Sequence, residues 1–227
     1  MTTPRWSLKM RRGKMSGAAV RIYSAEELKE MSVEEIAAAI DRDLYVDAYA
    51  VEPPIAYRGA KLAERLESML YLCPNCHGVD TLHSKNDRFF CTCGLSMRMN
   101  PYGRFEGESL PFSHPGEWDA WQTEQMKKIG TELTVSDGGQ SLYRLNLEDH
   151  SLTFVTEGEM RLSADGFSLG TFSATLREMD GIGLVQREKL VFGCNGENYV
   201  IRSEKPRCGR KYYDLYHVLK PNGMNTP

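Results

Sequence analysis

The stretch Cys73-Pro-Asn-Cys76, followed after the fourteen residues 77–90 by Cys91-Thr-Cys93-Gly94, decides how this sequence is interpreted. Each pair of cysteines lies in a short turn, and the segment between them is long enough for a hairpin that returns the second pair to the first. A zinc ion takes four such sulfur ligands in a tetrahedron. We therefore expect Cys73, Cys76, Cys91 and Cys93 to hold one zinc ion in a zinc ribbon spanning residues 73–94.

The zinc-ribbon hypothesis has alternatives. The second pair has the spacing C-x-C rather than the commoner C-x2-C, which makes the motif less specific. The four cysteines could instead hold an iron–sulfur cluster or be four unrelated thiols. His77 or His83 could also take the place of one cysteine. Because four thiolates leave no open coordination position, a zinc ion here is expected to be structural and not catalytic. Cys194 and Cys208 have no such partners nearby in the sequence and are interpreted as ordinary thiols.

The composition is that of an ordinary folded chain. Its 227 residues correspond to one large or two small domains, and 41% of them are apolar. No stretch approaches the roughly 18–20 apolar residues of a membrane span, and the first residues lack the apolar segment of a secretory signal. Six cysteines are too few for a disulfide scaffold of this size. We expect a cytoplasmic location, with peripheral contact at the inner membrane face as a variant of it.

Charge is distributed unevenly along the chain. Residues 1–22 carry six basic residues and no acid, whereas residues 23–71 carry eleven acids against five bases. The first segment is a basic arm, which either rests on an anionic membrane surface or is a solvated tail. Each Lys or Arg near such a surface contributes on the order of 1 kcal/mol to binding.

Helix signals follow the basic arm. Ser24-Ala-Glu-Glu27 and Ser32-Val-Glu-Glu35 have the pattern of capping boxes and predict helices over 25–31 and 33–40. Apolar residues at helical spacing predict a third helix over 59–70, so residues 23–72 are expected to be a helical segment. After the ribbon, residues 95–131 are expected to form a linker and a helix that begins near Pro115 and carries Trp118 and Trp121.

From residue 132 the pattern changes to short strands separated by turn signals. Asp137-Gly-Gly139 predicts a turn, and Asn195-Gly196 predicts a hairpin between 189–193 and 199–202. Apolar residues spaced from Tyr212 to Leu219 predict a closing helix. The expected fold class is α+β, with a small antiparallel β domain over 132–220. Its order of strands and final helix resembles the architecture of pleckstrin-homology-like barrels, which by itself says little about function.

Several short blocks, taken together, carry a resemblance to a known family. They are Pro4-Arg-Trp6, Arg11-Arg-Gly-Lys-Met15, Ser24-Ala-Glu-Glu-Leu28, Met31-Ser-Val-Glu-Glu-Ile36, Asp41-Arg-Asp-Leu44, Glu52-Pro53, Tyr57-Arg-Gly59, Ala63-Glu-Arg-Leu-Glu67, the Cys-Pro-x-Cys ribbon, Glu117-Trp118 with Trp121-Gln122, and Lys211-Tyr212. In this order they resemble the segment that closes the catalytic domain, and the region after it, in bacterial 1-acyl-sn-glycerol-3-phosphate acyltransferases. The resemblance covers most of the chain and implies a role in phospholipid biosynthesis.

The chain departs from the family pattern at the catalytic motif. The family's H-x4-D motif, in which a His base deprotonates the acceptor hydroxyl, lies upstream of the first of these blocks. His114 and Asp119 have the same spacing, but Pro115-Gly116 between them is typical of a helix start. No catalytic residue can therefore be carried over. We expect a truncated family member, an accessory region without acyl-transfer activity of its own.

The resemblance implies partners as well. They are the acyltransferase catalytic half and, through the basic arm, an anionic membrane surface. Nucleic acid is not expected, because the overall charge is −3 and the ribbon is not strongly basic. The alternative hypothesis is a stand-alone zinc-ribbon module that binds a protein, a nucleic acid or a membrane surface.

Overall fold

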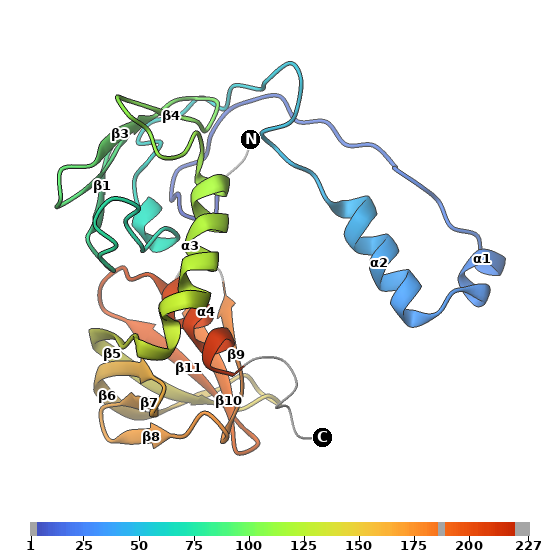
Figure 1. Cartoon of the computed structure of the whole chain (residues 1–227). Coiled ribbons are helices and arrows are strands. Elements are labelled where there is room, and N and C mark those ends of the chain that lie inside the picture. The colour runs from blue at the N-terminus through green and yellow to red at the C-terminus, as the bar shows by residue number, and fades with distance from the viewer. Residues whose placement is uncertain (1–3, 186–188, 221–227) are drawn as a thin grey trace.

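Two antiparallel sheets joined by a long helix form the body of the chain (Figure 1). The computed structural model describes residues 4–185 and 189–220. The first sheet has four strands in the order β1-β2-β3-β4, which are Leu82–Lys85, Arg88–Cys91, Ser96–Met99 and Phe105–Glu106. The helix is α3, Pro115–Ile129, and it is followed by the short 3-10 helix Gly130–Glu132. We call residues 59–106 the ribbon unit and residues 132–220 the β domain.

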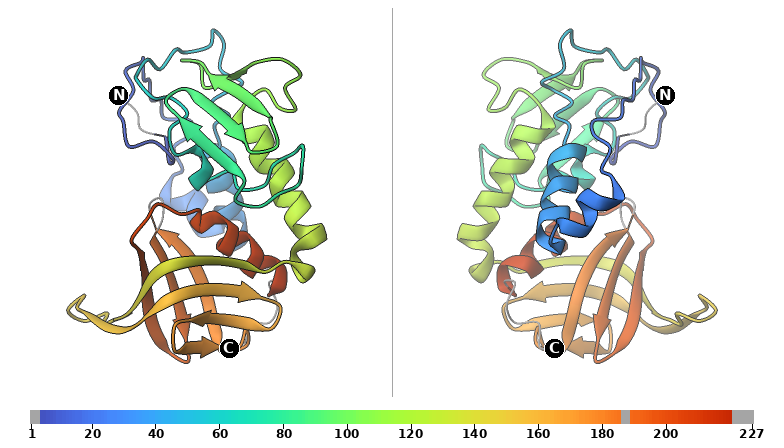
Figure 2. Two further views of the ribbon diagram at one scale, coloured as in Figure 1. Left: turned by 90° about the vertical axis from the view of Figure 1, so that its left-hand side faces the viewer. Right: turned by 90° about the vertical axis from the view of Figure 1, so that its right-hand side faces the viewer.

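The β domain contains a seven-stranded sheet and a final helix. Its strands are β5 Val135–Leu145, β6 Leu152–Ser163, β7 Gly166–Leu169, β8 Phe172–Ala174, β9 Met179–Val185, β10 Lys189–Cys194 and β11 Glu197–Ser203. They lie in the order β8-β7-β6-β5-β11-β10-β9, so the first strand pairs with the last. Helix α4, Gly209–Leu219, lies at the end of this sheet that faces the ribbon unit (Figures 1 and 2). The predicted α+β class with a closing helix is confirmed.

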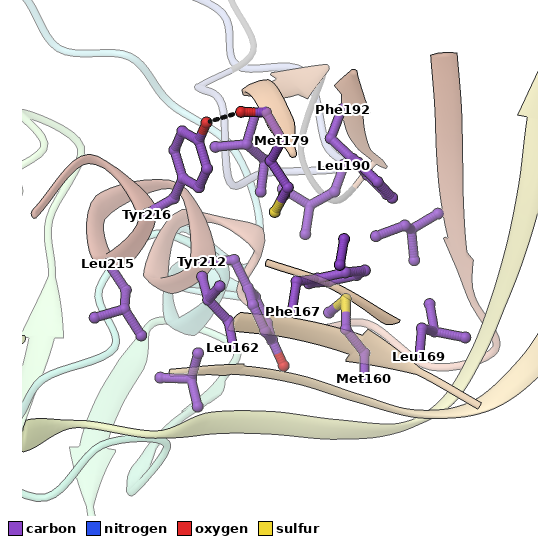
Figure 3. Close-up of a cluster of buried hydrophobic side chains, with 14 of the residues drawn as sticks. Met160, Leu162, Phe167, Leu169, Met179, Leu190, Phe192, Tyr212, Leu215 and Tyr216 are labelled. Carbon is purple, nitrogen blue, oxygen red and sulfur yellow. Dashed lines mark hydrogen bonds between the residues drawn. The ribbon is translucent and has the colours of Figure 1, made fainter. Parts of the chain in front are cut away.

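The core of the β domain lies between the curved sheet and α4 (Figure 3). Alternate residues of the strands point inward, among them Met160 and Leu162 of β6 and Leu190 of β10, all of which are fully buried. From α4, Tyr216 packs into the same core and its hydroxyl donates a hydrogen bond to the carbonyl of Met179 (3.1 Å). Burying this apolar area is the main force that holds the helix on the sheet.

Turn chemistry explains the hairpin between β10 and β11. Asn195 and Gly196 have φ of 51° and 77°, the left-handed conformation that a two-residue hairpin turn requires. The strands pair in register from Cys194 opposite Glu197 to Leu190 opposite Ile201, so the predicted hairpin is confirmed. The predicted turn at residues 137–139 is wrong, because this segment forms a bulge inside β5 where the pairing with β6 shifts register.

The predicted helix over 59–70 is also wrong. This segment contains turns and one 3-10 helix, Leu66–Ser68. Lys61 and Arg65 have positive φ, and the backbone N–H groups of Leu62, Ala63 and Arg65 donate to Asp87, Asn86 and Ser84. The apolar spacing reflects burial against the β1–β2 hairpin, whose hydrogen bonds replace those of a helix.

The two N-terminal helices project away from the body (Figure 1). They are α1 Ala25–Glu30 and α2 Val33–Leu44, and both begin with the predicted capping boxes at Ser24 and Ser32. Of all their residues, Ala39 is the one that is buried. In the part of the chain that the structure describes, no helix has the length and apolar character needed to cross a membrane.

The first part of the basic arm is not a solvated tail. Trp6 Nε1 and Arg11 Nη2 both donate to the carbonyl of Leu62, at 3.2 and 2.5 Å, and Arg11 is buried. The backbone of Arg12 pairs with that of Arg58. The arm is therefore anchored on residues 57–62 as far as Lys14, while the side chains of Lys9, Arg12 and Lys14 are exposed.

Candidate metal centre

The first cysteine pair lies in a tight turn between paired backbone segments. Leu72 and Val79 form an antiparallel bridge that closes the turn. Within it, the Cys73 N–H donates to the carbonyl of Gly78 (3.1 Å), and the His77 N–H donates to that of Cys73 (2.9 Å). A Cβ atom at Gly78 would lie 2.6 Å from a Thr81 methyl and 3.3 Å from Cys76 Sγ. Glycine at this position therefore lets the chain pass close to the sulfurs.

The second pair lies where β2 turns into β3. Cys91 is the last residue of β2, its N–H donates to the carbonyl of Leu95 (2.8 Å), and its own carbonyl accepts from Gly94 (3.1 Å). Gly94 has φ of 101°, a conformation that residues with a side chain rarely adopt. The turn therefore directs both Cys91 and Cys93 toward the first pair.

The structure brings the four sulfurs together, and all lie within 4.8 Å of one another. Cys73 Sγ is 3.8 Å from Cys93 Sγ, and Cys76 Sγ is 3.7 Å from Cys91 Sγ. These separations are far longer than a disulfide bond, and all four thiols are free. A tetrahedron with metal–sulfur bonds of about 2.3 Å has an edge of about 3.8 Å. The cluster can thus hold one metal ion with little change of geometry.

Hydrogen bonds and burial shift the pKa values of individual cysteine thiols in opposite directions. Asn75 Nδ2 donates to Cys93 Sγ (3.3 Å), and this hydrogen bond, together with one from the Leu95 backbone, lowers the pKa of Cys93 to about 6. Burial raises the pKa of the Cys73 thiol to about 12. The Thr81 hydroxyl lies 3.2 Å from Cys91 Sγ. A metal ion would offset the cost of ionising the buried thiol, because its charge stabilises a bound thiolate.

The two histidines considered as substitute ligands lie against aromatic rings. The His77 ring centroid is 5.9 Å from that of Trp121, and the His83 ring is 5.9 Å from Phe90. Among the described residues that could hold a metal ion, the group found here consists of the four cysteines. A ligand set of four sulfurs therefore fits the geometry best.

Helix α3 supports the first turn from one side. Trp118 is fully buried, and its Nε1 donates to the carbonyl of Leu72 (2.9 Å). Gln122, one turn later, accepts from the Tyr71 N–H (3.1 Å) and donates to the carbonyl of Met69 (2.9 Å). The sequence predicted this helix but not these contacts, which fix the position of the chain just before Cys73.

A polar network joins the ribbon unit to the β domain. Lys211 of α4 is fully buried, and its Nζ lies 2.5 Å from Asp80 and 3.0 Å from Asp137. The Tyr71 hydroxyl donates to Asp214 (2.8 Å). Sequence analysis missed this network, because its members are far apart in the chain and share no motif.

His114 and Asp119 do not form a catalytic pair. His114 is the N-cap of α3, where its Nδ1 accepts from the Gly116 N–H (3.1 Å), and its ring stacks on Tyr49. Asp119 accepts from Gln122 (2.9 Å) and pairs with Arg210. The interpretation of this stretch as a helix start is confirmed.

Comparison with known proteins adds little to this geometry. No protein-family model matches the sequence, and a search of curated proteins gives no match. A solved structure described as "A Systematic Screen for Protein-Lipid Interactions in Saccharomyces cerevisiae" aligns with 37% of this chain and 94% of its own, at 14% identity and a TM-score of 0.27. A similarity this low carries no argument about fold or function.

Proposed function

We propose that this chain is the accessory region of a 1-acyl-sn-glycerol-3-phosphate acyltransferase, in which a structural zinc ion holds the ribbon unit between a catalytic half and the β domain. The observation that carries the proposal is an unpartnered apolar surface on the projecting helices α1 and α2. Two of the sequence blocks that resemble the end of the family's catalytic domain, Ser24–Leu28 and Met31–Ile36, lie on these helices.

Zinc is the metal that suits the cysteine cluster best. Four sulfurs at tetrahedral separations match the ligand set of structural zinc sites. Four thiolates leave no place for a bound water, so the ion would stabilise the fold rather than react. Binding would supply folding energy to a region whose own apolar core is small.

The apolar surface on the helices is a groove of about 560 Å³. Its walls include Val20, Ile40 and Leu44, whose side chains are 72%, 52% and 76% exposed. Val46, two residues after the end of α2, is 75% exposed. An apolar surface of this kind, on helices with almost no core of their own, marks a protein interaction site. The catalytic half would cover it, as the resemblance implies.

Co-purification with a defined partner tests this function. The partner is the catalytic half of a bacterial acyltransferase of this family, with its H-x4-D motif, co-expressed with the full chain. The two should purify together, and Ile40→Asp with Leu44→Asp should abolish the association. The matched control is Leu147→Asp, since Leu147 is 61% exposed in the β domain and does not line the groove. Association that survives both groove substitutions, or no association at all, would contradict the proposal.

A second candidate function is peripheral binding to an anionic membrane through the basic arm. Leu8, Met10 and Met15 are 60%, 66% and 63% exposed among basic side chains, an arrangement that suits a membrane surface. Lys9, Arg12 and Lys14 would face the lipid phosphates.

Vesicle sedimentation tests this second function. The protein should sediment with phosphatidylglycerol vesicles and not with phosphatidylcholine vesicles. Changing Lys9, Arg12 and Lys14 to Glu should weaken the binding at least tenfold. The control changes three exposed basic residues of the β domain, Arg161, Arg177 and Lys189, to Glu. If both variants lost the same amount of vesicle binding, net charge and not the basic arm would be the cause of binding.

A further inference from the structure

Arg207 is an unusual side chain in this protein. It lies in the loop before α4, it is 5% exposed, and none of its three guanidinium nitrogens has a hydrogen-bond partner among the described residues. A buried cation without partners is costly, and such groups are rare in folded proteins. A side chain of this kind is explained if it binds a ligand.

The Arg207 side chain lines a cavity of about 310 Å³ between the ribbon unit and the β domain. Ser68, from the 3-10 helix of the ribbon unit, lines it as well, and its buried hydroxyl also lacks a partner. Helix α4 begins beside the cavity at Cys208, so the positive end of its dipole lies there. Hydrogen-bond donors without partners, from both the ribbon unit and the β domain, therefore line the same cavity.

The acidic residues of the cavity are mostly paired already. Asp80 and Asp137 both contact Lys211 Nζ, and Asp137 also accepts from the Tyr212 hydroxyl (2.8 Å). Lys211 is thus paired with two carboxylates, whereas Arg207 feels the charge of Asp137 but forms no hydrogen bond with it. Glu67 has one buried oxygen without a partner, which can accept a hydrogen bond from a ligand hydroxyl.

We propose that this cavity binds a small phosphate-bearing ligand, held by the Arg207 guanidinium and the Ser68 hydroxyl. Four donor atoms suit a phosphate group, which offers more acceptor oxygens than a carboxylate, and the planar guanidinium pairs with two of them at once. The volume admits a ligand larger than phosphate alone, so a phosphate monoester with a hydroxyl group for Glu67 fits best. Because the donors come from both units, the ligand would also fasten the two units together.

Calorimetry and thermal melting of the full, zinc-loaded chain test the site, in a buffer free of phosphate and sulfate. The probes are inorganic phosphate, glycerol 3-phosphate, glycerol and acetate at matched ionic strength. Inorganic phosphate and glycerol 3-phosphate should each bind and raise the melting temperature with concentration, and glycerol 3-phosphate should bind more tightly. Failure of both to bind would overturn the proposal, and acetate binding as tightly as inorganic phosphate would overturn the assignment to phosphate.

Two variants and a control make the test specific. Arg207→Met should weaken phosphate binding at least tenfold, because it removes the charged hydrogen bonds. Without ligand it should melt no lower than the native protein, since it removes a buried cation whose guanidinium has no hydrogen-bond partners. Ser68→Ala should weaken binding by a smaller factor, and Arg177→Met, an exposed arginine of the β domain, should have no effect. Unchanged affinity in Arg207→Met, or a marked loss of its stability without ligand, would show that Arg207 is structural.

Discussion

The ribbon unit and the β domain of this chain are stabilised in different ways. The β domain has an apolar core formed by the inward face of its curved sheet and by α4, with Met160, Leu190 and Tyr212 among its fully buried residues. The ribbon unit has short strands and a smaller core around Phe89, against which Trp118 of α3 packs and beside which the four cysteine sulfurs converge. Small units with little apolar surface to bury need another source of folding energy. We therefore expect the ribbon unit, and not the β domain, to depend on a bound metal ion for its stability.

The segment before Cys73 connects the two cores. Tyr71 and Leu72 are buried in the core of the β domain, whereas Leu70 and Cys73 are buried in that of the ribbon unit. One short stretch of chain therefore contributes side chains to both sides of the boundary. This arrangement places the cysteine cluster close to the junction that Lys211 and Asp80 bridge.

The largest effect is expected from replacing a metal ligand. Cys73→Ser should unfold the ribbon unit, since three sulfurs cannot complete the site and a structural zinc ion supplies most of the folding energy of such a unit. The strand signals of the β domain should persist in a two-dimensional NMR spectrum. Cys194→Ser, which changes a buried thiol outside the cluster, is the control. Loss of both units together would show that they do not differ in the way described.

The second prediction concerns a substitution that should destabilise the β domain and leave the ribbon unit unchanged. Leu190 is fully buried in β10, so Leu190→Ala should cost about 2–5 kcal/mol of stability, from lost apolar burial and the cavity left behind. Chemical denaturation monitored by circular dichroism measures this loss. Zinc affinity should change less than threefold. A large fall in zinc affinity would mean that the ribbon unit needs the β domain to fold.

The junction is expected to contribute less than either core. Lys211→Met leaves Asp80 and Asp137 without their shared cation, and both carboxylates are partly exposed to water. We expect a loss of about 1–3 kcal/mol, smaller than for a fully buried pair. The unfolding transitions of the two units should also move apart in calorimetry. A variant as stable as the native protein, with its transitions unchanged, would show that Lys211 does not couple the units.

The smallest effect is expected in the projecting helices. Ser32 caps α2 and accepts a hydrogen bond from the Glu35 N–H (3.2 Å), so Ser32→Ala should cost about 0.5–2 kcal/mol of helix stability. Hydrogen exchange should increase within α2 alone. If the melting of the ribbon unit or the β domain changed as well, the helices would be part of the folded body.

Local signals made part of this structure predictable. The capping boxes, the Asn195-Gly196 hairpin and the convergence of the cysteines each depend on residues close together in sequence, or on one motif with a strict geometry. The segment 59–70 was not predictable, because its backbone N–H groups find partners in a hairpin more than fifteen residues away. The same holds for the burial of Arg11 and the Lys211 network, whose partners lie 51 and 131 residues away in the chain.

X-ray absorption at the zinc edge, on the protein purified without added metal, tests the central claim most directly. The account predicts one zinc ion per chain with four sulfur neighbours at about 2.3 Å and no nitrogen or oxygen neighbours. A mixed shell that includes nitrogen or oxygen, a different metal, or the absence of bound zinc would contradict it.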